Sequence, residues 1–236
     1  LNSTKFKILA GNMDTGSGSS AKSAMFTPRG NEDWHSLAVS SDGKIFVIDS
    51  SRGLLYVNPF TNVQEVLLPK TGVISGDGGL ASNATSNDIF KINMDFQDRL
   101  LIWDDNRIRR IDTTTNPMTI ETIIGAKNDG TMGTNTNDII LDPADLRMYS
   151  GAGKMVTFQP MPNGDLYFMA GPYGTSVNGG NTLRVYRGSL STPTIETIRV
   201  SGTGAKATFS GAEADLSNDR IHSYNLVFNK DTSEIY

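Results

Sequence analysis

The segment FKINMDFQDRLLIWD, residues 90–104, decides the fold, because it joins two apolar runs through a short polar turn. The same pattern returns as HSLAVSSDGKIFVID at 35–49 and as MVTFQPMPNGDLYFM at 155–169. A fourth copy, YNLVFNKDTSEIY at 224–236, ends within the pattern. Alternating apolar residues predict half-buried strands, and Asp-Gly or Asn-Gly between two such runs is a strong hairpin signal. The sequence therefore predicts an all-β repeat architecture.

Each complete hairpin is followed by two further apolar runs. In the second and third copies the last run contains the same five residues, Thr-Ile-Glu-Thr-Ile, at 119–123 and 194–198. Each unit therefore predicts a four-stranded antiparallel meander, which is the blade of a β-propeller. We expect three complete blades, at about 35–69, 89–125 and 154–200, with a partial blade at each end of the chain.

The two ends of the chain carry incomplete units. Residues 4–10 have the pattern of an outer strand, and residues 221–236 have that of two inner strands. Together they could close a four-bladed ring, which would remove exposed sheet edges. We favour the other interpretation, in which residues 1–236 form a single propeller domain belonging to a larger propeller or polypeptide, because the closing blade lacks its third strand.

The composition supports strands and turns. The chain has 236 residues, of which 24 are Gly and 19% are charged, and this favours short strands over charged helices. Such a composition is common among exported bacterial proteins, and a chain that begins at Leu1 is expected to be a mature form or an excerpt. The absence of cysteine excludes disulfides and thiolate metal sites. A net charge of −4 disfavours nucleic acid as a partner, and no apolar run predicts membrane insertion.

Two short sequence motifs resemble those of the NHL-repeat propellers. These are the linker GDGGLAS at 76–82 and the strand junction WDDNRIRRI at 103–111, which resemble the Gly-Asp-Gly-Gly loop and the Asn-Arg-Ile-Arg strand of that family. The likeness covers most of the chain at the level of pattern, and it is complete only around residues 76–111. It implies a platform that binds proteins, glycans or nucleic acid, of the kind found in secreted bacterial surface and toxin-shell proteins. A few related propellers are metal-dependent lyases.

The two histidines, His35 and His222, stand just before the innermost strand of their units. In a closed ring they would lie near the same end of the central channel, where Asp33 or Asp219 could complete a hard-cation site. A metal-dependent lyase or hydrolase with a channel site near His35 and His222 is therefore the alternative function. The plainer interpretation is that both histidines pack at the start of a strand, and we expect neither a cofactor nor a resident metal.

Several charged residues are predicted to have structural roles. Asp49 and Asp104 end the second strand of their units, where a carboxylate can accept backbone N–H groups in a tight turn. Arg107 and Arg109 point to one side of a strand and Arg110 to the other, so the basic cluster is split between two faces. We expect these arginines to pair with nearby aspartates such as Asp104, or to pack between blades, rather than to bind RNA.

Long loops between blades are the expected place for recognition. The glycine-rich insert at 171–180 contains Tyr173 and Asn178, and exposed aromatic residues such as Tyr173 can stack on the apolar faces of sugars. We expect a non-catalytic binding or structural module of an exported bacterial surface, fibre or toxin-associated protein, outside the cell or on its surface, that recognises a glycan or a protein. The predicted ligand contacts are Trp34, His35, Tyr173, Asn178 and His222. No catalytic residue is assigned, and the oligomeric state is open.

Overall fold

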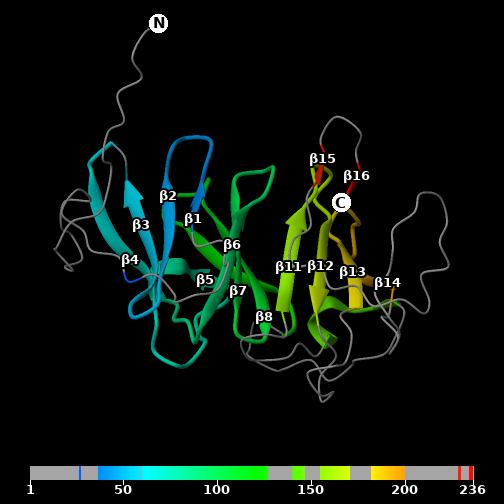
Figure 1. Ribbon diagram of the computed structural model, residues 1–236. Helices are drawn as coiled ribbons and strands as arrows, with labels where there is room; N and C mark the ends of the chain where they lie inside the picture. The colour runs from blue at the N-terminus through cyan, green and yellow to red at the C-terminus, as the bar shows by residue number, and fades with distance from the viewer. Residues whose placement is uncertain are drawn as a thin grey trace, which may run out of the picture.

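The computed structural model describes residue 27 and residues 37–58, 60–126, 140–146, 155–170, 182–199, 228–229 and 234–235. These residues form three large antiparallel sheets, built from strands that follow one another in the chain. Figure 1 shows the three sheets side by side in chain order. The predicted all-β fold of four-stranded antiparallel units is confirmed, whereas no closed ring of sheets is seen among the described strands.

The first sheet consists of β1 (Leu37–Val39), β2 (Ile45–Asp49), β3 (Gly53–Asn58) and β4 (Val63–Pro69). The second contains β6 (Ile89–Met94), β7 (Arg99–Asp104), β8 (Arg107–Asp112) and β9 (Thr119–Ile124). The third contains β11 (Met155–Pro160), β12 (Leu166–Ala170), β13 (Thr182–Arg187) and β14 (Thr194–Arg199). A separate hairpin pairs β15 (Phe228–Asn229) with β16 (Glu234–Ile235).

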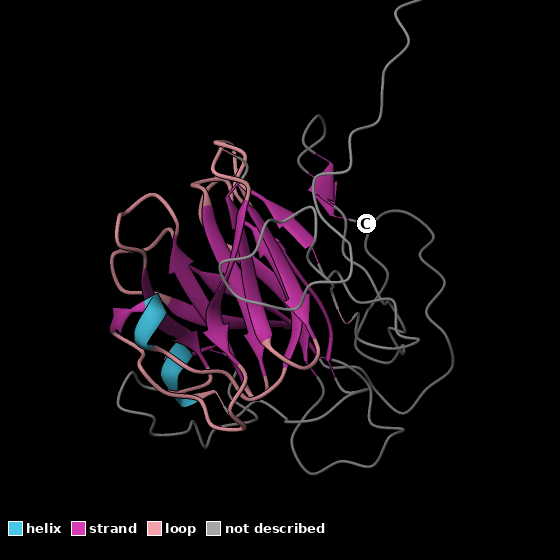
Figure 2. Ribbon diagram, turned by 90° about the vertical axis from the view of Figure 1, so that its left-hand side faces the viewer, coloured by secondary structure: helices cyan, strands magenta, loops and turns pink. Residues whose placement is uncertain are grey.

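The second and third sheets each gain a fifth strand of two residues from the linker that precedes them. β5 (Gly79–Leu80) pairs with the outer strand β9, and β10 (Ile140–Leu141) pairs with the outer strand β14. A short 3₁₀ turn follows each of them, η1 (Ala81–Asn83) and η2 (Pro143–Asp145). Figure 2 shows both helical turns on the same side of the stacked sheets. The four-stranded prediction therefore needs this addition, because the linker also belongs to the sheet.

The first hairpin turn of each sheet has the same backbone hydrogen bonds. In the turns over 40–44, 95–99 and 161–165, the first residue donates its N–H to the carbonyl of the fifth and accepts from the N–H of the fourth. The fourth residue is in the left-handed region in all three, with φ of 86° at Gly43, 57° at Asp98 and 91° at Gly164. Glycine adopts this conformation without a steric cost, and aspartate is one of the few other residues that tolerate it. The turn that lacks glycine thus folds in the same way.

Two apolar cores join the sheets. Phe46 and Ile48 of β2 pack with Leu100 and Ile102 of β7 in the core between the first and second sheets. The alternate residues of β7, among them Trp103, pack in the core between the second and third sheets. Because successive side chains of a strand point to opposite faces, the second sheet is buried on both sides. Trp103 is 1% exposed, so it lies fully within the core.

The stacking follows one rule from sheet to sheet. Phe46 and Ile48 of β2 point towards the second sheet, which is the next sheet in the chain. The equivalent residues of β7, Leu101 and Trp103, point in the same direction, towards the third sheet. Residues on the opposite face of the third sheet, such as Leu166, point back towards the second sheet. Each sheet thus has a forward face and a backward face, and the forward face of one packs on the backward face of the next.

Candidate functional site

The predicted ligand contacts do not fall within the part of the chain that the structure describes. Trp34, His35, Tyr173, Asn178 and His222 all lie outside the described residues. Their roles, including the channel site proposed for the two histidines, stay predictions.

Asp49 takes the turn-forming role that its place in the sequence predicts. Its Oδ1 accepts the backbone N–H groups of Ser51 and Arg52 at 3.0 and 2.9 Å, and its Oδ2 accepts the N–H of Thr27 at 2.8 Å. The Arg52 guanidinium lies 2.8 Å from the same carboxylate. Burial works to raise the pKa of Asp49, but these donors outweigh it and hold the pKa well below its usual range. The carboxylate therefore stabilises a turn.

Asp104 accepts backbone groups from the preceding linker rather than from the turn that follows it. Its Oδ1 lies 3.1 Å from the backbone nitrogens of both Asn87 and Asp88. Its Oδ2 accepts from Nη1 of Arg109 at 2.9 Å, in an ion pair of two fully buried side chains. Burial raises the pKa of the Asp104 carboxyl, and the Arg109 charge opposes that rise. The predicted pairing of the arginine cluster with Asp104 is confirmed.

Asp77, in the linker motif GDGG, is a second partner of Arg109. Nε of Arg109 donates to Oδ1 of Asp77 at 2.8 Å, and the Thr122 hydroxyl donates to Oδ2 at 2.7 Å. Arg107 lies 3.4 Å from the same carboxylate. Arg109 also donates to the carbonyl oxygens of Ser75 and Thr85. Four residues of the linker and the sheet thus enclose one buried guanidinium, and this cluster is a structural joint.

Arg110 lies on the other face of β8, as the alternation predicts. Its guanidinium contacts Glu121 of β9 at 2.5 Å, and 45% of the Glu121 side chain is exposed. The three arginines are therefore divided between a buried cluster and a surface ion pair. They do not form a continuous basic surface of the kind that follows a nucleic-acid backbone.

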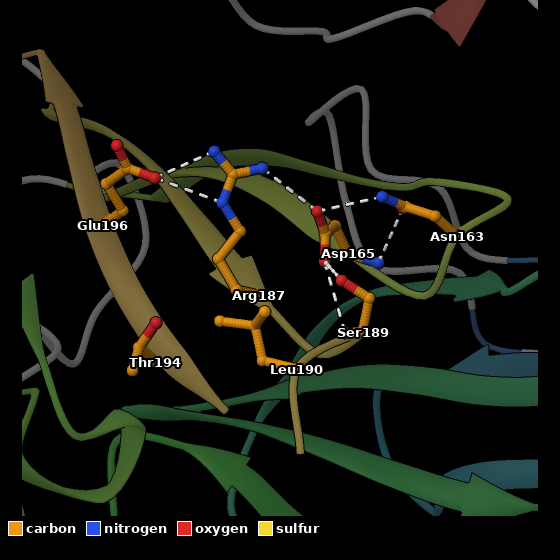
Figure 3. Close-up of a pocket in the computed structure, with 7 residues that line it drawn as sticks. All are labelled: Asn163, Asp165, Arg187, Ser189, Leu190, Thr194 and Glu196. Carbon is orange, nitrogen blue, oxygen red and sulfur yellow. Dashed lines mark hydrogen bonds and ion pairs between the residues drawn. The ribbon is translucent and has the colours of Figure 1, made fainter. Parts of the chain in front are cut away.

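The clearest concave site among the described residues is a polar hollow of about 530 Å³ on the forward face of the third sheet. Figure 3 shows that its side chains come from the β11–β12 turn, from β13 and the turn that follows it, and from β14. The lining residues are Asn163, Asp165, Arg187, Ser189, Leu190, Thr194 and Glu196.

Arg187 is the centre of this hollow. Its Nε and Nη2 donate to Oε2 of Glu196 at 3.1 and 2.8 Å, and its Nη1 donates to Oδ2 of Asp165 at 3.1 Å (Figure 3). The hydrogen bond to Glu196 is the largest cause that raises the pKa of Arg187. One guanidinium is therefore shared between two carboxylates, which holds the turn and two strands in a fixed arrangement.

Asp165 connects the two turns at the mouth of the hollow. The Ser189 hydroxyl donates to Oδ1 at 2.8 Å, and Nδ2 of Asn163 donates to Oδ2 at 3.1 Å. Burial favours a raised pKa for Asp165, but the hydrogen bonds from Ser189 and Arg187 lower it. Asp165 is thus an ionised acceptor whose oxygens are already in use.

The chemistry of the hollow is that of hydrogen bonding. The described residues that line it include no histidine, cysteine or lysine, and their two carboxylates are held by Arg187, so these two carboxylates form no nucleophile and base pair. Elsewhere in the described ranges there is no group of three or more His, Asp or Glu side chains placed to hold a metal ion. Within those ranges, no helix is long and apolar enough to cross a membrane.

Sequence reasoning did not identify this hollow. Glu196 and Glu121 are the glutamates of the duplicated Thr-Ile-Glu-Thr-Ile run, and each pairs with an arginine of the neighbouring strand. This repeated glutamate is the sequence feature that could have indicated an ion pair at this position of each sheet. The arginines do not stand at the same register position, since Arg110 lies opposite Glu121 whereas Arg187 lies opposite Thr194.

Comparison with known proteins gives no family. No family model matches the sequence, and no curated protein is similar to it. One similar solved structure is a protein of unknown function from Bacteroides thetaiotaomicron, with 13% identity and a TM-score of 0.44 over 78% of this chain. Another is an auxiliary nutrient binding protein from the same organism, with 14% identity and a TM-score of 0.46 over 83% of this chain. The chain spans 40% and 42% of the lengths of these two proteins.

Proposed function

We propose that this chain is an NHL-like β-propeller segment that serves as a non-catalytic binding module of an exported bacterial surface, fibre or toxin-associated protein. It recognises a glycan or a protein through the loops between strands and sheets. The observation that carries the proposal is one sheet that occurs three times and packs by one rule at two interfaces, with one connection that breaks the repeat.

That connection joins the second and third strands of the third sheet. The equivalent connection is residues 50–52 in the first sheet and residues 105–106 in the second, and in the third it is residues 171–181. Propeller blades tolerate such insertions because the loop lies outside the packed strands, and loops on a rigid scaffold commonly carry recognition. The insertion contains Tyr173 and Asn178, the aromatic and amide residues that the sequence predicts to contact a ligand.

The scaffold itself supports binding rather than catalysis. In the described residues the buried acidic groups Asp49, Asp77 and Asp104 each have arginine or backbone partners that stabilise a turn or a linker. Perturbed ionisable groups can mark catalytic sites, but ion pairs that stabilise a fold perturb them as well. The contacts of these three residues favour the second explanation.

The test is a binding assay on the intact chain and on a loop variant. Glycan-array and pull-down experiments are expected to detect a ligand whose binding survives a chelator. Replacement of residues 171–181 by the Asp-Asn turn of 105–106 should abolish that binding and leave the circular dichroism spectrum unchanged. Tyr173→Ala and Asn178→Ala, made singly, should weaken binding without loss of the fold.

Two results would overturn the proposal. Undiminished binding by the loop variant would remove the loop from recognition. A stoichiometric divalent ion in the purified chain, with an activity that His35→Ala abolishes, would instead support a metal-dependent lyase or hydrolase.

A further inference from the structure

The buried arginine of the second sheet has a counterpart in the third. Asp104 ends β7, and Arg109 of the next strand lies opposite the residue two places before it. Ala170 ends β12, and Arg184 of the next strand lies opposite the residue two places before it. Arg184 therefore stands in the place of Arg109, and Ala170 stands in the place of Asp104.

The second strand of the first two sheets ends in an aspartate that is bonded to an arginine. Asp49 contacts Arg52 at 2.8 Å, and Asp104 contacts Nη1 of Arg109 at 2.9 Å. The second strand of the third sheet ends in Ala170, a residue type without a carboxylate. The third sheet thus has the buried arginine of the second sheet but not this counter-ion.

The Arg184 side chain shows the consequence at one atom. Arg184 is 5% exposed, and burial lowers the pKa of its guanidinium. Its Nη1 is buried and has no hydrogen-bond partner within the part of the chain that the structure describes, whereas Nη1 of Arg109 is the nitrogen that donates to Asp104. Arg184 has other interactions, so the difference concerns this one nitrogen. A buried charged donor is costly without an acceptor, and an anion beside Nη1 would stabilise the fold.

The position of the absent carboxylate adjoins the connection that distinguishes the third sheet. In the second sheet, residues 105–106 follow Asp104 and lead directly into β8. In the third sheet, residues 171–181 follow Ala170 before β13 begins. The insertion proposed to carry recognition therefore starts at the residue after Ala170.

We propose that Nη1 of Arg184 binds the carboxylate of a ligand, in the place that the Asp104 side chain has beside Arg109. A guanidinium N–H donates to a carboxylate oxygen in a charge-assisted hydrogen bond, which is among the stronger kinds in proteins. The same carboxylate group occurs in a free small acid and in an acidic sugar. The site follows from the comparison of the two sheets, and only the choice of an acidic sugar rests on the proposed function.

Thermal unfolding of the whole chain in the presence of sodium acetate tests the site. Acetamide, which has the shape of acetate without its charge, is the control compound, and sodium fluoride keeps the ionic strength constant. A ligand that binds only the folded state raises Tm, so acetate at about ten times its Kd should raise the Tm of the parent by about 3–6 °C. Acetamide should leave Tm unchanged.

Three variants locate the response. Arg184→Met should abolish the acetate shift, whereas Arg110→Met, which breaks a surface ion pair of the second sheet, should retain it. Ala170→Asp returns the counter-ion to the chain, so its Tm should exceed that of Ala170→Asn and should no longer respond to acetate. The aspartate and asparagine variants have the same size, and a difference between them reports the charge.

Sodium glucuronate, tested in the same way, separates the two sources of the carboxylate. A shift with glucuronate that Ala170→Asp abolishes identifies an acidic sugar, and a shift with acetate alone identifies a free small acid. No shift of the parent with either compound, or equal shifts in the parent and Arg184→Met, would overturn the inference. Binding that depends on residues 171–181 but is unaffected by Ala170→Asp would leave the proposed function intact.

Discussion

Replacement of Arg109 by Met should produce one of the largest losses of stability available in this chain. Arg109 is fully buried, and its guanidinium lies 2.8 Å from Asp77 and 2.9 Å from Asp104, whose side chains are 2% and 0% exposed. Methionine fills much of the same volume and leaves two buried carboxylates without their shared cation. Breaking a buried ion pair by removing one partner costs about 3–5 kcal/mol.

The assay is thermal unfolding followed by calorimetry or circular dichroism. For a domain of this size each kcal/mol shifts Tm by about 2–4 °C, so Arg109→Met should lower Tm by about 10 °C. Arg110→Met is the matched control on the same strand, because its partner Glu121 is 45% exposed. A surface pair of this kind contributes about 0–1 kcal/mol, so the control should shift Tm by no more than a few degrees.

The pH dependence provides an independent check. Burial already raises the pKa of Asp104, and loss of the Arg109 charge removes the effect that opposes the rise. A carboxyl whose folded pKa lies above its unfolded value of about 3.9 destabilises the fold above that range and ceases to do so when it is protonated. The stability deficit of Arg109→Met relative to the parent should therefore shrink as the pH falls from 7 towards 4. Equal Tm values for Arg109→Met and Arg110→Met, or a deficit independent of pH, would refute this account.

Three further predictions concern single side chains. Asp49→Asn should destabilise the fold by about 1–3 kcal/mol in urea unfolding at pH 7. Because the folded pKa of Asp49 is depressed, the parent loses the stability that this carboxylate contributes as the pH falls below about 4, whereas the variant has no such contribution to lose. Gly53→Ala should prevent folding or lower Tm strongly, since its φ is +104° and a Cβ would lie 2.2 Å from a backbone oxygen, whereas Gly72→Ala, with φ of +82° and open space, should cost only about 1 kcal/mol. Desolvation lowers the pKa of Lys91 to about 8, so the folded parent loses this buried charge, and gains stability, between pH 8 and 10. Lys91→Met should raise Tm at pH 7 and abolish the gain in stability between pH 8 and 10. If Tm of Lys91→Met follows pH as the parent does, this account is wrong.

The strands and hairpin turns were predictable because their signals are local. Alternation along 90–94 and 99–104 marks β6 and β7, and the turn residues 41–43 and 162–164 contain the glycine that a left-handed position favours. The turn at 96–98 has no glycine, and its agreement with the other two comes from Asp98, which tolerates the same backbone conformation.

The fifth strands and the buried ion cluster were not predictable in the same way. Two-residue strands such as β5 have no period that a pattern could reveal. Asp77 is 32 residues from Arg109 in the sequence, and only the pairing of β5 with β9 brings the linker beside β8. From the sequence, Asp77 in the glycine-rich motif GDGG indicates a turn. In the structure it is a buried counter-ion of Arg109.

The polar hollow depends on register, which the sequence states only indirectly. Asp165, Arg187 and Glu196 meet because the β11–β12 turn and the β13–β14 register place them on one face of the third sheet. The run Thr-Ile-Glu-Thr-Ile identifies the glutamate, but the position of its arginine differs between the second and third sheets. The sequence alone therefore does not predict the hollow.

The contact of Asp77 with Arg109 has a consequence for how the chain can be divided. The linker of 70–88 is bonded into the sheet that follows it, so one structural repeat of the chain begins with the linker and ends with the outer strand. Fragments or circular permutants cut just before a linker should therefore retain their structure better than those cut just after it. The sequence repeats this arrangement in the next unit, where Asp138 stands two residues before β10, as Asp77 does before β5, and Arg184 aligns with Arg109.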